Sequence, residues 1–288
     1  MINIHLNVRH ATAQDHRQIS SLITQDSNTH RHLDWRTALE WIGTQNFWVL
    51  EDQGTVVAAL ACPEDPPDIA WIRLFSHHPH LSGPEAWSVL WETVHAEVFA
   101  ANPRAQIASI VMKPWWHTLL VENGFEQRFN IVLLELHSEN FSSSQIPQNL
   151  NIRPMQAADF FLVEQIDRQA FGAFWHNTLD SLQRAHGQSY YSSVAEDESG
   201  VIGYQISTGN PFGAHLARLA VRPEAQRRGV ASALVQDLVQ QAGALQSGRL
   251  SVNTQEDNQA SLRLYEKLGF VRTGEYYPVF VYPVRDGK

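Results

Sequence analysis

Two segments of this sequence align with each other half a chain apart. Residues Asn7–Asp15 match Asn151–Asp159, an offset of 144 positions (151 minus 7). Repeat arrays have much shorter periods, so a match at this distance predicts two copies of one fold. The polar, serine-rich stretch 138–150 lies between the copies and is the expected linker. The expected domains are therefore residues 1–137 and 151–288.

The second copy contains a strand, a turn and a helix start in an order that suits a polyphosphate. Leu216–Val221 is an apolar run expected to form a buried strand, and the spacing of Val230, Leu234 and Leu238 predicts a helix after the turn. The first amides of a helix have no partner within it, and the helix dipole favours an anion there. Gly229 would let the backbone approach a phosphate closely. An ordinary strand–loop–helix with solvated arginines is the alternative interpretation of this stretch alone.

A second block follows at a fixed distance. Arg249–Thr254 is expected to form a strand, and Asn258–Leu268 a helix that ends at Gly269. Gln226–Ala231 resembles the Q/R-x-x-G-x-G/A acetyl-CoA motif of the Gcn5-related N-acetyltransferase (GNAT) superfamily. The second block resembles the later signature of that family, with matching order and spacing. The sequence is thus similar to that family over about 150–288, and only faintly over the first half.

This resemblance implies a fold, a cosubstrate and a reaction. The implied fold is α/β (α+β): two tandem GNAT-like domains, each a mixed, mostly antiparallel central sheet flanked by helices. The implied reaction is direct transfer of an acetyl group from acetyl-CoA to an amine. The residues that correspond to the acetyl-CoA site are Leu219, Ala220, Val221, Gln226, Arg227, Arg228, Gly229, Val230, Ala231, Asn258, Ser261 and Tyr265.

Two of these residues carry alternative interpretations. Tyr265 matches the general acid of the family, which protonates the departing thiolate, but a core tyrosine would fit the same position. Asn258 would bind the pantetheine arm, and its position also suits a helix N-cap. The two roles of Asn258 are compatible.

The general base and the acceptor are less well defined. Some relatives carry a glutamate near the position of Ser251, and this chain lacks that glutamate. His215 and Glu196 are weak candidates for the base. Family substrates lie near segments that are aromatic or acidic in this chain, which implies a small-molecule or peptide amine with an apolar portion. The candidate acceptor residues are Phe171, Phe174, Trp175, Glu275 and Tyr276.

The first copy lacks the chemistry of the second. At the constant offset, Glu85 falls opposite Gly229, where a carboxylate would repel a phosphate. Further along the chain the offset becomes 145, and there Leu120 falls opposite Tyr265 (265 minus 120). The first half is therefore expected to be a degenerate copy that does not bind acetyl-CoA. Its many tryptophans are expected to fill a core rather than to form a binding platform.

Composition bounds the remaining classes. The formal net charge is −9, which argues against non-specific nucleic-acid binding. No run of about eighteen apolar residues occurs, so no membrane span is expected. A single cysteine, Cys62, and the absence of a secretory signal indicate a cytoplasmic protein, and no metal site is expected. We expect a monomer or homodimer, with a non-catalytic acyl-CoA-binding regulatory or scaffold protein as the alternative to an N-acetyltransferase.

Overall fold

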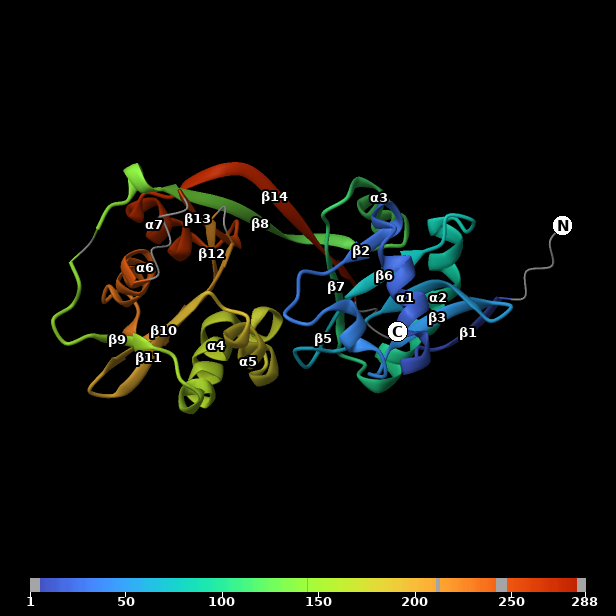
Figure 1. Cartoon of the computed structure of the whole chain (residues 1–288), viewed down its shortest axis with the longest axis horizontal. Helices are drawn as coiled ribbons and strands as arrows, with labels where there is room; N and C mark the ends of the chain where they lie inside the picture. Colours follow the sequence, from blue (N-terminus) through green and yellow to red (C-terminus); the bar gives the residue numbers. More distant parts are fainter. Residues whose placement is uncertain (1–5, 144, 211–212, 242–247, 284–288) are drawn as a thin grey trace. The chain divides into compact units, whose positions relative to one another are not determined.

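The computed structural model describes residues 6–143, 145–210, 213–241 and 248–283, and the chain divides into two compact units (Figure 1). The first unit contains residues 1–128 and 278–288, and the second contains residues 129–277. These units differ from the expected domains because residues 129–137, at the end of the first half, belong to the second unit, and residues 278–288, at the end of the second half, belong to the first.

The first unit contains two sheets. Strands β1-β3-β4-β6-β2 form an antiparallel sheet, and β5 pairs in parallel with β7. Its helices and strands are β1 (Leu6–His10), η1 (Ala13–Asp15), α1 (His16–Ile23), η2 (Asp26–Asn28), β2 (Thr29–Arg31), η3 (Ala38–Trp41), β3 (Phe47–Asp52), β4 (Thr55–Ala61), β5 (Ile69–Trp71), β6 (Leu74–His77), α2 (Gly83–Ala101), β7 (Gln106–Ile110) and α3 (Pro114–Glu122), and β8 (Glu126–His137) begins here.

In the second unit, β9, β10, β11 and β12 pair antiparallel, β12 pairs in parallel with β13, and β13 pairs antiparallel with β8. Its elements are η4 (Ser138–Asn140), β9 (Asn151–Pro154), η5 (Ala157–Asp159), α4 (Phe160–Trp175), α5 (Leu179–Gly187), β10 (Tyr191–Asp197), β11 (Gly200–Asn210), β12 (Gly213–Val221), η6 (Pro223–Ala225), α6 (Val230–Gln241), β13 (Arg249–Gln255), α7 (Gln259–Leu268) and most of β14 (Val271–Tyr282).

The two halves exchange their last strands. In the second unit, residues 131–137 of β8 pair with β13. In the first unit, Val279–Tyr282 at the end of β14 pair with β7. Each half thus completes the sheet of the other unit, and neither half has a complete set of strands from its own sequence.

The repeat is visible in an ion pair at the start of each half. Arg9 Nη1 lies 2.8 Å from Asp15 Oδ2, and Arg153 Nη1 lies 2.8 Å from Asp159 Oδ2. In both halves the arginine donates to both carboxylate oxygens. The same local device joins the first strand to the turn before the first helix in each copy.

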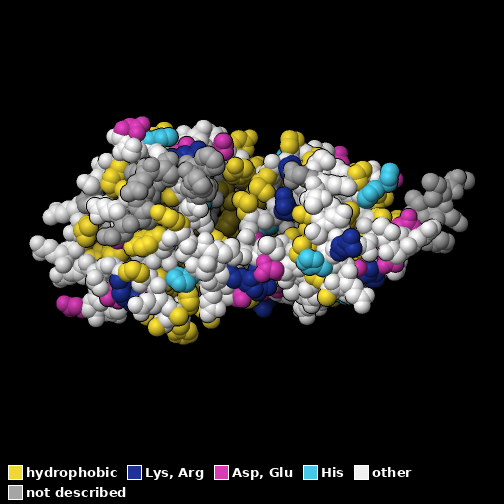
Figure 2. Space-filling view, viewed as in Figure 1, with side chains coloured by type: hydrophobic (Ala, Val, Ile, Leu, Met, Phe, Trp, Pro, Cys, Tyr) yellow, Lys and Arg dark blue, Asp and Glu magenta, His cyan; other side chains and the backbone are white. Residues whose placement is uncertain are grey.

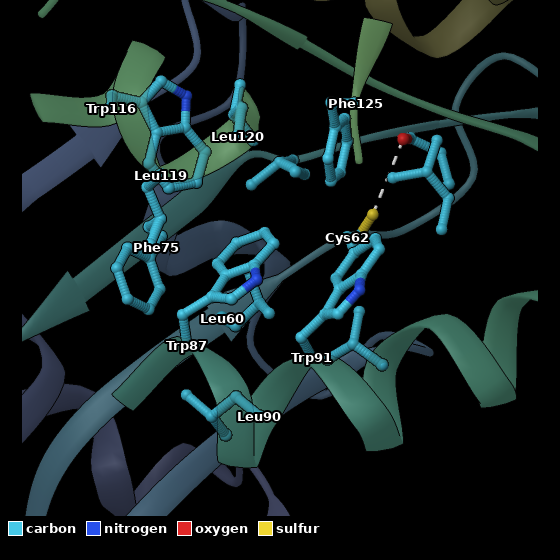
Figure 3. Packing of buried hydrophobic residues seen from close by; sticks show 14 of the residues in the cluster. Leu60, Cys62, Phe75, Trp87, Leu90, Trp91, Trp116, Leu119, Leu120 and Phe125 are labelled. Atoms are coloured by element: carbon cyan, nitrogen blue, oxygen red, sulfur yellow. Dashed lines mark hydrogen bonds between the residues drawn. The ribbon is translucent and has the colours of Figure 1, made fainter. Parts of the chain in front are cut away.

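Aromatic side chains fill the core of the first unit, as the sequence predicted. Phe75 from β6 packs against Trp87 of α2, at 5.4 Å between ring centroids, and against Trp116 of α3, at 5.5 Å. All three are at most 1% exposed. Figure 3 shows these rings close together beside Leu119 and Leu120. We call Phe75, Trp87 and Trp116 the aromatic cluster.

The constant offset of the repeat is wrong at the start of α2. The Ser82 carbonyl accepts the Ala86 N–H at 3.0 Å, and the Gly229 carbonyl accepts the Ala233 N–H at 3.0 Å, so each is the N-cap of its helix. Ser82, not Glu85, therefore corresponds to Gly229. The turn before α2 is three residues shorter than the turn before α6. The spacing of apolar residues within each helix does not reveal this difference.

Candidate functional site

Strand β12 leaves part of its edge open. In its antiparallel pairing with β11, Ile206 lies opposite Arg218 and the next residue, Ser207, lies opposite Leu216. Ala217 therefore has no partner in the register and forms a bulge. The parallel pairing with β13 covers only Ala214 to Leu216. Residues 219–221 lie beyond that pairing, where an extended chain can add to the strand.

The turn after β12 exposes backbone amides. Gln226 Nε2 donates to the Val221 carbonyl at 3.1 Å and so ties the turn to the strand. Arg227 and Gly229 both have positive φ, at 60° and 85°. Such left-handed residues next to a helix start form a concave set of N–H groups that suits an anion. A side chain at Gly229 would be strained because L-residues rarely adopt this conformation.

The two arginines of the turn differ. Arg227 lines the pocket described below. Arg228 Nη2 instead lies 2.9 Å from Asp197 Oδ2, and the Arg228 side chain is about half exposed. Hydrogen bonds from Ser199 and from Arg228 lower the pKa of Asp197 to about 2. A contact between Arg228 and a cofactor stays a prediction, and would require this ion pair to open.

A pocket of about 750 Å³ lies between the turn, β12 and α7. Its volume falls within the range of small-molecule sites, about 300–1,000 Å³. It brings together most of the residues that the sequence predicted for the cofactor. Those residues are Leu219, Ala220, Val221, Gln226, Arg227, Gly229, Val230, Ala231, Asn258 and Ser261. We call it the second-unit pocket.

Asn258 begins α7. Its Oδ1 accepts the Ser261 N–H at 3.1 Å, so the side chain caps the helix. Asn258 and Ser261 both line the second-unit pocket. Because the cap uses the oxygen of the amide, the Asn258 NH₂ group can donate to a ligand, which is compatible with both interpretations of this residue.

Tyr265 lies in the core beside the pocket. It is 4% exposed and packs on Phe270, with 5.3 Å between ring centroids. Burial raises the pKa of Tyr265 above its ordinary value, so the hydroxyl is protonated at neutral pH. This is the protonation state that a general acid needs, although Tyr265 is absent from the residues that line the pocket.

The two candidate bases differ. His215 on β12 has its Nδ1 2.9 Å from Ser251 Oγ, and burial lowers the pKa of His215. Its ring is therefore neutral near pH 7. Glu196 accepts from Arg153 Nε at 3.0 Å and from Asn151 Nδ2 at 2.7 Å. Neither His215 nor Glu196 is among the residues that line the second-unit pocket. Glu51 makes the matching contact with Arg9 in the first copy, so the role that the structure supports for Glu196 is structural.

The predicted acceptor residues occupy different places. Phe171 lines the second-unit pocket and stacks under the Arg218 guanidinium, 3.5 Å from its carbon to the ring centroid. Phe174 and Trp175 pack together against Phe129. The remaining two lie on β14, where Glu275 accepts from the Tyr277 hydroxyl at 3.2 Å and Tyr276 is 62% exposed. The structure thus brings only Phe171 of this set into the pocket.

A buried charged network beside Phe171 was not anticipated. Asp167, fully buried on α4, accepts from Arg218 Nε at 2.7 Å and Nη2 at 2.8 Å, and also from the Tyr204 hydroxyl. Arg218 Nη2 also donates to the Trp175 carbonyl at 2.7 Å. This network fixes α4 to β11 and β12. Two features of the sequence could have indicated this network: Asp167 lies on the apolar face of α4, and Arg218 lies within a strand that was expected to be buried.

Two basic residues of α7 were also missed. Arg263 and Lys267 line the second-unit pocket. They are four residues apart, so they lie on one face of the helix. Their spacing from Asn258 was the available signal.

Several classes of site lack support in the described part of the chain. There, no helix is long and apolar enough to cross a membrane, and no group of three or more His, Cys, Asp or Glu side chains could hold a metal ion. Acidic and basic side chains are interspersed on the face drawn in Figure 2. That arrangement is unlike the continuous basic face typical of nucleic-acid-binding proteins.

Comparison with known proteins finds a family match within the second half. Residues 154–270 match the acetyltransferase (GNAT) family. A curated relative, the spore coat polysaccharide biosynthesis protein SpsD of Bacillus subtilis, is 27% identical over 103 residues, which cover 36% of this chain and 36% of that protein. The chain thus spans about a third of the length of this relative.

Solved structures resemble the whole chain. A GCN5-related N-acetyltransferase from Sphaerobacter thermophilus aligns with a TM-score of 0.63 and 15% identity, over 98% of this chain and 97% of that one. A tandem GNAT protein from the clavulanic acid biosynthesis pathway aligns with a TM-score of 0.63 and 13% identity, over 99% and 100%. At these identities the likeness concerns the fold, and it confirms the predicted pair of tandem GNAT-like domains.

Proposed function

We propose that the second half of the chain, where residues 154–270 match the acetyltransferase (GNAT) family, transfers an acetyl group from acetyl-CoA to a primary amine. The observation that carries the proposal is the second-unit pocket, where the edge of β12, the start of α6 at Gly229 and the N-cap of α7 converge. The first half has a structural or substrate-shaping role in this proposal.

The binding roles follow from the contacts. The amides at the start of α6, with Arg227, hold the pyrophosphate. The main chain of residues 219–221 pairs with the pantetheine arm as an added strand would, and the Asn258 amide donates to the same arm. Arg263 and Lys267 provide positive charge for a further phosphate group of the cosubstrate.

The chemical roles fall to two side chains. The thioester of acetyl-CoA supplies the acyl group; a C–N bond to the amine forms and the C–S bond breaks. His215, neutral because burial lowers its pKa, accepts the amine proton through water. Tyr265 donates its hydroxyl proton to the departing sulfur. For this step its hydroxyl must reach the inner end of the pocket.

The acceptor lies on the Phe171 side of the pocket. Phe171 provides an aromatic surface, and Arg218 above it is neutralised by Asp167. A small amine, or the amine of a peptide, with an apolar portion suits such a wall. A non-catalytic acyl-CoA-binding role is the alternative, which the position of Tyr265 outside the pocket lining favours.

An amine panel separates these two functions. Purified protein is incubated with acetyl-CoA and aliphatic, aromatic and peptide amines, and thiol release is measured. Release that depends on the amine supports the enzyme. Binding of acetyl-CoA without release on any amine of the panel would favour the binding protein, and absence of binding would contradict both.

A further inference from the structure

Helix α4 is broken directly after Phe171, a residue that lines the second-unit pocket. The break is at Gly172, whose φ of 66° and ψ of −173° form a combination essentially restricted to glycine. A Cβ at this position would meet no atom within 4 Å, so the backbone conformation, not lack of space, requires the glycine. The break therefore sets the path of the chain on the far side of Phe171.

Arg218 and Asp167 hold the chain on both sides of this break. Before it, the Arg218 guanidinium stacks on the Phe171 ring, 3.5 Å from its carbon to the ring centroid. After it, Arg218 Nη2 donates to the Trp175 carbonyl at 2.7 Å, and Asp167 Oδ1 accepts the Asn177 N–H at 2.6 Å. Asp167 also neutralises the charge of Arg218. We call this buried ion pair the clamp.

The first copy folds without an ion pair at the corresponding positions. At the offset of 144, Ile23 falls opposite Asp167 and Leu74 falls opposite Arg218. Ile23 and Leu74 pack in one apolar cluster of the first unit. Replacement of a buried ion pair by apolar side chains is often neutral or stabilising. The stability of this fold therefore does not explain the clamp, which belongs to the copy with the second-unit pocket.

The clamp fixes the Phe171 ring. One face of the ring carries the guanidinium, so rotation of the ring would lose this contact. An acceptor that packs against such a fixed wall has its amine at a defined distance from the thioester. The rate depends on this placement, since an error of about 1 Å can cost about 10²-fold.

We infer that Asp167, Arg218 and Gly172 are positioning residues for the acceptor amine, because they hold Phe171 as one wall of its site. The inference rests on the proposed function, since that reaction defines the acceptor. In the same proposal the cosubstrate is held by the main chain of residues 219–221, the turn before α6 and the start of α7. A change at Gly172, on α4, should therefore weaken use of the acceptor and leave cosubstrate binding intact.

The first test is steady-state kinetics of Gly172→Ala in the full-length protein, on an amine that the wild type acetylates. This variant keeps every side chain of the clamp and strains only the backbone. The kcat/KM for the amine should fall about tenfold or more, mainly through the amine KM, while the acetyl-CoA Kd from calorimetry stays within about twofold. Gly187→Ala, at a glycine of α5 with open space and without positive φ, is the matched control and should change neither value. Unchanged kinetics in Gly172→Ala, or equal losses for amine and cosubstrate, would overturn the inference.

A triple variant separates positioning from stability. Asp167→Ile with Arg218→Leu installs the apolar pair of the first copy, and Tyr204→Phe removes the hydroxyl that would lose its acceptor. The melting temperature should be retained, while kcat/KM for the amine falls at least as far as in Gly172→Ala. A stable triple variant with full activity would overturn the inference.

Fluorine NMR gives a readout that does not depend on turnover. With 4-fluorophenylalanine in place of Phe171, Gly172→Ala should shift or split the fluorine resonance, and an accepted amine should shift it in the otherwise unchanged protein. A resonance that responds to neither would overturn the inference while the proposed function stands. Absence of acetylation on every amine would instead remove the proposed function, and the inference with it.

Discussion

The helices α2 and α6 follow corresponding strands in the two copies, and their N-termini are in opposite states. At α2, Ser82 Oγ accepts the Glu85 N–H, and the Glu85 carboxylate accepts the Ser82 N–H at 3.2 Å. The Ser82 hydroxyl also donates to the Glu85 carboxylate, at 2.6 Å, and this bond, together with the one from the Ser82 N–H, lowers the pKa of Glu85 and favours its ionised form. At α6, Gly229 has no side chain, so the first amides face the second-unit pocket. A capping box thus closes in one copy the anion site that the other leaves open.

The same contrast continues into the pocket. Phe75 of the aromatic cluster corresponds to Leu219, at the offset of 144 positions. Trp116 corresponds to Ser261, because each lies three residues after the N-cap of its helix. Leu219 and Ser261 line a pocket, whereas the two aromatic side chains pack on each other in a buried core. Exchange of two side chains for larger ones converts a binding volume into a core. Under the proposed function, this cap and this packing are the reasons why we expect the first copy not to bind the cosubstrate.

The largest expected effect comes from closing the open helix start. Gly229→Glu places a carboxylate at the phosphate site and strains the backbone, so acetyl-CoA affinity should fall by more than about 10³-fold. Gly54→Glu, at another glycine with positive φ and open space around it, is the matched control and should leave affinity unchanged. Calorimetric titration measures both. Retained affinity in Gly229→Glu would mean that the phosphate site is misplaced.

The second prediction concerns the difference between Tyr265 and Leu120 at one position of the copies. Tyr265→Phe should reduce turnover by about 10²–10⁴-fold and leave acetyl-CoA affinity within about twofold, because the hydroxyl acts on the departing sulfur. Tyr190→Phe, on an exposed tyrosine, is the control. Steady-state rates on an accepted amine provide the measurement. An unchanged rate in Tyr265→Phe would remove this residue from the mechanism.

A third prediction tests whether the aromatic cluster serves stability alone. Trp116 donates to Ser109 Oγ at 2.9 Å and stacks on His30, so Trp116→Ala should destabilise the first unit by about 3–5 kcal/mol. Acetyl-CoA affinity of the folded variant should be unchanged. Denaturant unfolding and titration measure the two effects. A large loss of affinity would show that the cluster supports the binding site as well.

The smallest effect concerns a feature that the copies share. Hydrogen bonds from Arg9 lower the pKa of Asp15 to about 2. The folded pKa lies below the unfolded value, so the stabilisation is complete above about pH 4 and is lost as pH falls toward 2; it amounts to about 2 kcal/mol. Asp15→Asn should cost this amount at pH 7 and flatten the acid limb. Asp159→Asn, which removes the same arginine contacts, should behave similarly, and a much larger cost for either would show that the copies use the pair differently.

The sequence predicted the duplication and the second-unit pocket because both depend on local signals. Asn7–Asp15 repeats in Asn151–Asp159, and the turn before α6 has its glycine next to the helix. The strand exchange of β8 and β14 could not be predicted, because either pairing satisfies the same alternation of side chains. The alignment of Glu85 with Gly229, which assumed a constant offset, was also wrong. The shorter turn shifts α2 by three residues relative to α6, and the spacing of apolar residues within the helix stays the same.

Other parts of the site depend on contacts between distant residues. Asp167 and Arg218 are fifty-one positions apart, and only the fold shows that they neutralise each other. The sequence offered Glu196 only as a weak candidate for the base. Its contacts with Arg153 and Asn151 explain it as part of the ion pair that both copies contain.

Titration of the full-length protein with acetyl-CoA, with the number of sites recorded, tests the split between the copies most directly. One site per chain is the predicted result, because the capping box and the aromatic cluster close the first copy. Two sites of comparable affinity would contradict this account, and would show that Ser82, Glu85 and Trp116 do not exclude the cosubstrate.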